Sequence, residues 1–315
     1  MVVHVAAVTP LYPPESRVGA WLATHEYLKA CVDAGHTVTC VASLAAGPGY
    51  RLDGVDVLNG VKHIQDVVSA GDVVVSHLGD QGTAHEFAVR RGVPSVRMVH
   101  GLAPPNQLRK FRQFPVSLLV WNSESSLAAA GWDGPSLVAR PPLIPDRFVT
   151  TPGSCVTQVN ISDAKGGPLF GKLVRFMPDL SFLAVRGGYG RQRDPYGKNV
   201  RIMLPTPNMR DDVYAQTRVV TIPSKWETWG MVGPEAMCSG IPVVAAPTPG
   251  LRESLGAAGI FVEVANFQGW VETVRRLFDD EVAWQEASER SLERAAQLVA
   301  QDDRPRFVEA LEGLV

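Results

Sequence analysis

Short apolar runs rich in valine and alanine alternate with helical patterns and glycine-marked turns along most of the chain. Residues 2–8 predict a buried strand, residues 21–34 an amphipathic helix, and residues 37–43 the next strand. Further strands are expected at 73–77, 95–100 and 118–122, with a helix at 83–91. Alternation of this kind is typical of an α/β fold, in which helices cover both faces of a parallel sheet.

A proline-rich stretch at residues 140–146 interrupts this pattern. Proline disfavours helix and stiffens the chain, so the stretch predicts a linker between two domains, residues 1–145 and 146–315. After the linker, strands are expected again at 155–160, 181–185, 200–203, 219–222 and 241–245. From Phe267 the pattern predicts two or three surface helices. They belong to the second domain or, alternatively, return to the first.

The composition is that of an ordinary globular protein. The chain has 315 residues, 45% of them hydrophobic and 20% charged, which is enough apolar material for two cores. A net charge of −2 excludes a global basic field that would bind nucleic acid or an anionic membrane. No apolar run reaches the roughly 18 residues that span a bilayer. The opening residues carry no basic segment or cleavage site and predict a buried strand rather than a signal peptide.

The four cysteines are scattered among apolar neighbours and form no C-x-x-C pair. Their pattern favours free thiols over disulfides or a metal site, and therefore a cytoplasmic protein. They are Cys31, Cys40, Cys155 and Cys238.

The most informative segment is residues 223–245. It places Glu227 on a loop after a predicted strand and Glu235 in a helix, with Pro234 in the first turn of that helix and Gly240 at its end. The two oxygens of a glutamate match the adjacent hydroxyls of a vicinal diol, as in ribose. A second carboxylate nearby suits a sugar hydroxyl.

This segment resembles the E-x7-E signature of the retaining nucleotide-sugar glycosyltransferases with the GT-B fold, family four in the usual classification of sugar enzymes. The pattern P-S-x-x-E-x-x-G, followed by E-A-M-x-x-G-x-P-V-V-A, agrees at almost every position. The resemblance implies two Rossmann-like, doubly wound domains facing a cleft, the first on the acceptor side and the second on the donor side. It also implies that Glu235 holds the nucleoside, that Glu227 orients the sugar, and that Gly230 lies at the donor.

Residues 159–167 resemble the family element G-R-L-x-x-x-K-G. The resemblance implies that Lys165 meets the donor diphosphate, where an ammonium neutralises charge building on the leaving group. Asn160 stands at the usual arginine position. Asparagine donates a hydrogen bond but carries no charge, so this departure predicts weaker phosphate binding or a substitute cation.

Two arginines in a glycine-rich loop, Arg186 and Arg191, are candidate substitutes for the missing charge. Gly188 in the same loop is a candidate donor-binding residue, although a plain surface turn is an equal interpretation. Gly250 matches the family's G-x-x-E element, where backbone amides at a helix start bind phosphate. Glu253 is either part of that element or a favourable first-turn charge.

The first domain agrees with the family in outline. Gly19 matches one glycine of the flexible loop that the family closes over the diphosphate. His100 lies in a V-H-G sequence whose histidine, by the resemblance, faces the transferred sugar. We interpret His36 as structural, whereas His25 and His77 either line the acceptor side or belong to the framework.

The function implied is transfer of a sugar from a nucleoside-diphosphate sugar to an acceptor hydroxyl, with retention of configuration. The departing phosphate takes the acceptor proton, so Lys165, Glu227 and His100 assist without a covalent nucleophile. No metal and no further cofactor are expected, and Asp211 with Asp212 begins a helix-like stretch rather than a metal pair.

Three alternatives stay open. The first is a related GT-B enzyme, a sugar-nucleotide epimerase or a phosphorylase. The second is a glycosyltransferase acting on nucleic acid, and the third is a non-catalytic sugar-nucleotide binder, to which Asn160 lends weight. The second rests on a basic stretch with interleaved aromatic rings, which is alternatively a solvated face or a site for an anionic lipid. Its residues are Arg90, Arg91, Arg97, Arg109, Lys110, Phe111, Arg112 and Phe114.

Overall fold

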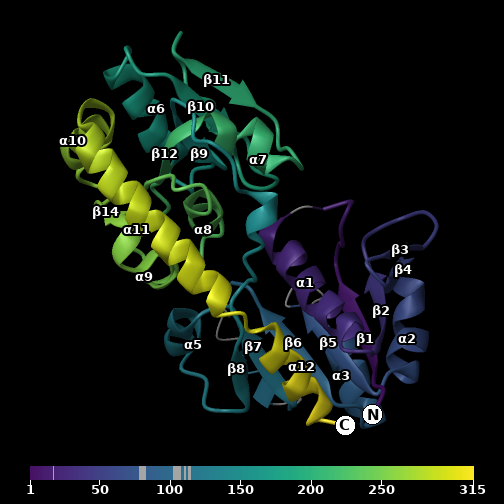
Figure 1. Cartoon of the computed structure of the whole chain (residues 1–315). Helices are drawn as coiled ribbons and strands as arrows, with labels where there is room; N and C mark the ends of the chain where they lie inside the picture. The colour runs from purple at the N-terminus through teal and green to yellow at the C-terminus, as the bar shows by residue number, and fades with distance from the viewer. Residues whose placement is uncertain (17, 78–82, 102–107, 110, 113–114) are drawn as a thin grey trace. The chain divides into compact units, whose positions relative to one another are not determined.

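The computed structural model describes the chain except residues 17, 78–82, 102–107, 110 and 113–114. Its contacts divide into two compact units, Met1–Pro142 with Asp302–Val315, and Leu143–Gln301. The chain leaves the first unit within the proline-rich stretch and returns to it just before its last helix, α12 (Arg304–Glu312) (Figure 1).

Within the described residues, the first unit is built on an eight-stranded sheet of order β3-β4-β2-β1-β5-β6-β7-β8. All neighbouring strands are parallel except β3 and β4. The strands are β1 (His4–Thr9), β2 (Thr37–Ala42), β3 (Tyr50–Leu52), β4 (Val55–Asn59), β5 (Val73–His77), β6 (Ser95–Val99), β7 (Leu118–Trp121) and β8 (Ser136–Val138).

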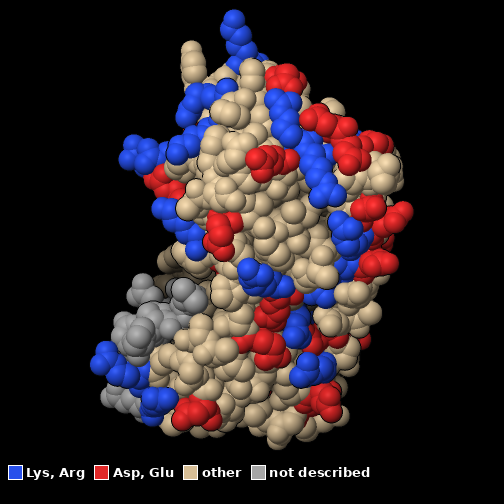
Figure 2. Space-filling view, turned by 90° about the vertical axis from the view of Figure 1, so that its left-hand side faces the viewer, with Lys and Arg blue, Asp and Glu red and all other residues tan. Residues whose placement is uncertain are grey.

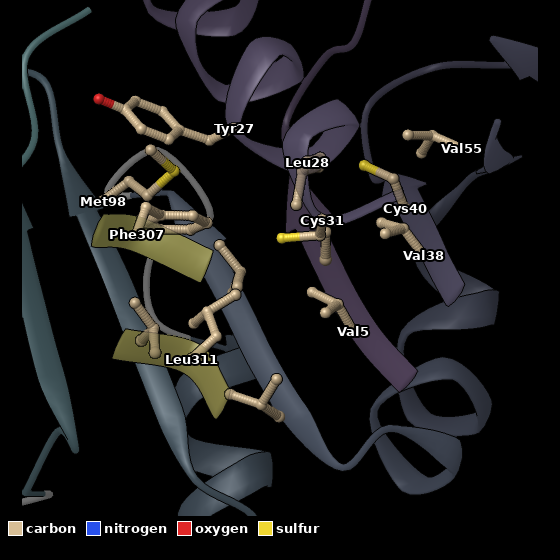
Figure 3. Packing of buried hydrophobic residues seen from close by; sticks show 14 of the residues in the cluster. Val5, Tyr27, Leu28, Cys31, Val38, Cys40, Val55, Met98, Phe307 and Leu311 are labelled. Atoms are coloured by element: carbon tan, nitrogen blue, oxygen red, sulfur yellow. The ribbon is translucent and has the colours of Figure 1, made fainter. Parts of the chain in front are cut away.

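The strands of this sheet are apolar on both faces because helices cover both. Along β1, Val5 and Ala7 belong to one core cluster and Ala6 and Val8 to another, as the two-residue period of a strand requires. Helices α1 (Gly19–Asp33) and α12 close the first cluster, and α2 (Ile64–Ala70) and α3 (Thr83–Arg91) close the second. Figure 3 shows the first cluster, with Phe307 of α12 beside the strands. A further helix, α5 (Glu124–Ala130), follows β7.

The second unit, in its described residues, is built on a six-stranded parallel sheet of order β11-β10-β9-β12-β13-β14. The strands are β9 (Cys155–Val159), β10 (Phe182–Val185), β11 (Val200–Met203), β12 (Thr217–Ile222), β13 (Val243–Ala245) and β14 (Ile260–Phe261). The helices are α6 (Gly167–Phe176), α7 (Met209–Asp212), α8 (Val232–Met237), α9 (Pro249–Leu255), α10 (Phe267–Asp279) and α11 (Glu281–Ala300).

Two core clusters again lie on opposite faces of this sheet. One cluster joins the sheet to α8, α9 and α11, and the other joins it to α6 and α10. Neighbouring residues of one strand alternate between them: Leu183 and Val185 belong to the first, and Phe182 and Ala184 to the second. Of the helices that the structure describes, none is long and apolar enough to span a membrane.

The strands expected from the apolar runs are present, with ends shifted by a residue or two. The expectations did not include the hairpin of β3 and β4, the short strands β8 and β14, or the helices α2 and α5. The hairpin turns at Asp53 and Gly54, whose φ angles are 48° and 84°. An Asp-Gly pair is a strong hairpin signal, so this element was open to prediction.

The first unit consists of two chain segments, Met1–Pro142 and Asp302–Val315, and a buried carboxylate joins them. Asp303 is 5% exposed and accepts hydrogen bonds from Arg140 N at 3.0 Å, Arg140 Nη1 at 3.3 Å and Arg306 Nη1 at 2.9 Å. The hydroxyl of Tyr27 on α1 donates to the carbonyl of Arg140. These bonds tie the returning chain to the end of the sheet domain.

We expect Asp303→Ala to lower the free energy of unfolding by about 3 kcal/mol, because it removes a buried acceptor and leaves the partly buried donors of Arg140 without it. Urea denaturation measures the change. Asp133→Ala removes the partner of Arg112 in an exposed ion pair of the same unit and should cost less than about 1 kcal/mol. Equal losses in the two variants would contradict the role of burial.

Candidate functional site

An ion pair lies at the carboxyl ends of two neighbouring strands of the second unit. β9 and β12 are parallel, with Thr157 opposite Val220, so the loops that follow them leave the sheet at the same edge. Lys165 Nζ donates to Glu227 Oε1 at 2.6 Å, and Ser224 Oγ donates to the same oxygen at 3.0 Å. Ligands of open parallel sheets bind at this edge.

The pair is only partly exposed. The side chains of Lys165 and Glu227 are each 13% exposed, and Lys165 Nζ lies 5.4 Å from the centre of the Trp226 ring. The backbone carbonyl of Lys165 accepts a hydrogen bond from Gln158 Nε2 at 2.9 Å, which fixes its turn. Because solvent is partly excluded, an anion that reaches this ammonium is attracted more strongly than in bulk water.

Close backbone approaches around the pair require glycine at two positions. Gly166 has φ of 80°, and an added Cβ would lie 2.3 Å from the carbonyl oxygen of Pro223. At Gly250 an added Cβ would lie 2.4 Å from the carbonyl oxygen of Glu227. Gly230, which follows Glu227 with φ of 79°, completes the turn that presents the carboxylate. The glycines expected from the motif therefore shape the loop that carries Glu227.

Asn160 serves the local backbone. Its φ is 62°, a left-handed conformation that asparagine adopts more readily than most residues. Its Oδ1 accepts hydrogen bonds from Ser162 N at 3.2 Å and from Gln192 Nε2 at 3.3 Å. Gln192 also binds Gly187 N through Oε1 at 2.9 Å. Asn160 and Gln192 thus join the loop after β9 to the glycine-rich loop after β10, which contains Gly188.

The candidate substitute cation Arg186 is engaged by an acid. Its guanidinium forms a two-pronged pair with Asp194, both side chains about two-fifths exposed. A second pair, between Arg193 and Asp163, has distances of 2.6 and 2.8 Å and lowers the pKa of Asp163. The sequence did not single out this second pair. Arg191, the other candidate cation of the glycine-rich loop after β10, is exposed.

Glu235, on α8, is partly buried and has a buried partner. Tyr214, in the short helical turn before β12, donates its hydroxyl to Glu235 Oε2 at 2.6 Å. Burial raises the pKa of Glu235, and the hydrogen bond from Tyr214 partly offsets that rise. The contact joins positions 21 residues apart, and the sequence did not indicate it.

In the first unit, His100 follows β6 and contacts His77 at the end of β5. His77 Nε2 and His100 Nδ1 are 3.0 Å apart, and the rings stack with centroids 5.1 Å apart. Burial lowers the pKa of His100 to about 4 and that of His77 well below its usual value, so both are neutral at neutral pH. Trp21 of α1 packs on His77 at 4.3 Å.

Three other candidate residues of the first unit are His36, His25 and Gly19. His36 accepts a hydrogen bond from Val3 N and contacts Glu312 of α12 at 3.0 Å, which makes it a structural link. His25 lies between the Tyr12 hydroxyl at 2.8 Å and Asp53 at 2.9 Å. Gly19 begins α1, and outside its chain neighbours and its own helix backbone no described atom lies within 4 Å of where its Cβ would be.

The basic stretch considered for nucleic acid is not a continuous surface patch. Arg97 is 1% exposed, Phe111 is 4% exposed, and the guanidinium of Arg97 lies 5.2 Å from the centre of the Phe111 ring. That part of the interpretation was wrong, because β6 carries Arg97 into the core. Lys110 and Phe114 lie outside the described residues. On the face shown in Figure 2, acidic and basic side chains are interspersed over much of the surface.

Asp211 and Asp212 each accept hydrogen bonds from neighbouring side chains. Asp211 accepts hydrogen bonds from Arg210 and Asn208, and Asp212 accepts one from Thr206. Among the residues that the structure describes, no three His, Cys, Asp or Glu side chains are grouped to hold a metal ion.

Residues 182–280 match the family model described as glycosyl transferases group 1. D-inositol 3-phosphate glycosyltransferase 1 of Catenulispora acidiphila is 36% identical over 118 residues, which cover 36% of this chain and 26% of that protein. The corresponding enzyme of Mycolicibacterium smegmatis is 34% identical over 125 residues, 38% of this chain and 28% of its own length. The matched part thus spans about a quarter of these relatives.

Solved structures match over nearly the whole chain. HepE of Anabaena, in complex with UDP-glucose, has a TM-score of 0.78 at 17% identity and covers 99% of both chains. Sucrose-phosphate synthase of Thermosynechococcus elongatus has a TM-score of 0.74 at 14% identity, covering 99% of this chain and 98% of its own.

The fold is therefore that of the GT-B glycosyltransferases, with two parallel-sheet α/β domains. Within the second unit, residues 182–280 are similar to the glycosyl transferases group 1. Both findings confirm the resemblance drawn from the E-x7-E segment.

We expect Gly250→Ala to destabilise the protein by about 1–3 kcal/mol and to displace Glu227, because its Cβ meets backbone atoms that cannot rotate away. Urea denaturation tests the first effect. Gly171→Ala, inside α6 where an added Cβ makes only ordinary contacts at 3.9 Å, should instead stabilise by about 0.5–1 kcal/mol. Stabilisation by both substitutions would disprove the close approach at Gly250.

We also expect Glu235→Gln to melt at a higher temperature than the wild type at neutral pH. The pKa of Glu235 is raised in the folded state, so ionising this carboxylate costs folding free energy. The wild type therefore loses stability as the pH rises from the ordinary glutamate pKa through the raised one. Glutamine does not ionise, so the variant avoids this loss. The difference should vanish below the ordinary glutamate value of 4.5.

The control is Glu281→Gln on α11. A hydrogen bond from Arg218 lowers the pKa of Glu281, so this variant should melt below the wild type at neutral pH, again with a difference that closes in acid. Thermal denaturation over a pH series measures both. A Glu235→Gln difference of the same size at every pH would contradict the raised pKa.

Proposed function

We propose that this protein is a retaining, metal-independent glycosyltransferase that moves a sugar from a nucleoside-diphosphate sugar to an acceptor hydroxyl. The observation that carries the proposal is the Lys165–Glu227 pair at the carboxyl ends of β9 and β12, with Glu235 on the helix that follows. The family match at residues 182–280 and the GT-B fold support it.

Lys165 is the group that binds the diphosphate in this proposal. Its ammonium is partly desolvated and held by Glu227, so it is positioned before a ligand arrives. Backbone amides at the start of α9, near Gly250, and in the glycine-rich loop at Gly188 add donors for the same anion. Arg186 is paired with Asp194, so the carboxylate already neutralises much of the positive charge that Arg186 would offer to the diphosphate.

The transfer requires no covalent intermediate on the enzyme. The bond between the anomeric carbon and the donor phosphate oxygen breaks, and the acceptor oxygen forms its bond on the same face. The acceptor proton passes to the departing phosphate oxygen, and the electron pair of the broken bond stays with the diphosphate. Lys165 neutralises that developing charge, while Glu227 orients the sugar through its hydroxyls.

Glu235 holds the ribose, and residues of the first unit complete the proposal. His100 is neutral at neutral pH and is able to hydrogen-bond a sugar hydroxyl in either direction. Gly19, the first residue of α1, is the residue of the first unit that this proposal places at the diphosphate. UDP and UDP-glucose, named with the HepE structures, support a nucleoside-diphosphate sugar as donor.

The four cysteines are free thiols, which supports a cytoplasmic location.

Lys165→Met should reduce turnover of the donor at least about 100-fold, because the leaving diphosphate loses its charge partner. Release of nucleoside diphosphate from UDP-glucose, GDP-mannose and ADP-glucose, with and without sugar acceptors, is the measurement. Lys172→Met, an exposed lysine on α6, is the matched control and should leave turnover unchanged.

The same assay separates the alternatives. Binding of a sugar nucleotide without any release of diphosphate would favour a non-catalytic binder. Conversion to an isomeric sugar nucleotide would favour an epimerase. Full turnover by Lys165→Met would overturn the role given to this lysine.

A further inference from the structure

Tyr214 is a buried phenol whose hydroxyl points at the carboxylate of Glu235. The side chain is 0% exposed, and its hydroxyl lies 2.6 Å from Glu235 Oε2. That distance is typical of an O–H donor to an ionised acceptor. Glu235 is itself partly exposed, so the contact joins a phenol in the core to a residue with part of its surface in solvent.

The ring of Tyr214 is fixed from several directions. Phe148 packs edge-on against it, with centroids 6.1 Å apart. The following residues are anchored as well, because Gln216 N and Thr217 Oγ1 both donate to the carbonyl of Val213, at 3.1 and 2.7 Å. These contacts hold the phenol oxygen in one place, from which its hydroxyl donates to the carboxylate.

The contact restricts what Glu235 offers to a ligand. A carboxylate has two oxygens and about four lone-pair positions, and one donor occupies one of them on Oε2. The remaining positions, including both on Oε1, lie in an orientation that the Tyr214 contact sets. Without that donor, a glutamate on a six-residue helix such as α8 has several rotamers to choose from.

We propose that Tyr214 is a positioning residue for ribose recognition: its hydroxyl holds Glu235 so that the carboxylate meets the two ribose hydroxyls of the donor nucleoside together. The inference rests on the proposed function, since it deepens the role of Glu235. Tyr214 does not touch the ligand and acts only through Glu235.

The test compares binding of UDP with that of 2′,3′-dideoxy-UDP by calorimetry, with GDP and 2′,3′-dideoxy-GDP in parallel. The two ligands of each pair differ only in the ribose hydroxyls, so the ratio of their affinities measures what these hydroxyls contribute to binding. Tyr214→Phe keeps the ring and removes the donor, so it should weaken binding of the ribonucleotide about tenfold and leave the dideoxy form unchanged. A merely structural role would lower both affinities together or neither.

Tyr27→Phe is the matched control, because it removes another buried hydroxyl that donates a hydrogen bond, to Arg140 in the first unit. It should lower the melting temperature comparably and leave the affinity ratio unchanged. Measurement well below the melting temperature of every variant keeps lower stability from affecting the ratio.

Glu235→Ala distinguishes the proposed ribose contact of Glu235 from the positioning role of Tyr214. If it abolishes the ratio while Tyr214→Phe leaves the wild-type value, the positioning role of Tyr214 is wrong and the proposed ribose contact stands. If Glu235→Ala leaves the affinity ratio unchanged, Glu235 does not bind the ribose, and the positioning role of Tyr214 is wrong as well. A reduced ratio in both variants, with Tyr27→Phe unchanged, supports the proposal.

Discussion

The adjacency of β9 and β12 determines the candidate site. These strands are parallel neighbours in the sheet, so the loops at their carboxyl ends meet although Lys165 and Glu227 are 62 residues apart. Backbone contacts at Gly166 and Gly250 then bring the loops close enough for a 2.6 Å ion pair. A slip of either strand would separate the lysine from the carboxylate, because strand register sets where each loop leaves the sheet.

Partial burial gives the acidic groups of the second unit different properties. Glu235 is withdrawn from water, and its pKa is raised, whereas exposed acids such as Asp163 and Asp194 are paired with arginines and have lowered pKa values. A half-buried carboxylate costs stability at neutral pH. Proteins retain such groups where a ligand later compensates the cost, which agrees with the ribose-binding role proposed for Glu235.

Much of the fold was predictable because apolar runs buried between helix layers leave a direct pattern in the sequence. The strands near residues 4–9, 37–42 and 155–159 follow from valine-rich runs, and the E-x7-E segment indicated the glycosyltransferase fold. Shorter elements were missed where the pattern was weak, as for α5 and β14. The β3–β4 hairpin was missed although Asp53 and Gly54 signal its turn.

The sequence by itself determined the residue types of the candidate site: the lysine, the two glutamates eight positions apart, and the glycines at close approaches. Only the tertiary structure decided their partners, namely Ser224 and Lys165 for Glu227, Tyr214 for Glu235, and Asp194 for Arg186. The physical reason is that local pattern reports burial and backbone conformation. A side-chain contact depends instead on which strands become neighbours, and the sheet order β11-β10-β9-β12-β13-β14 is not the order of the chain.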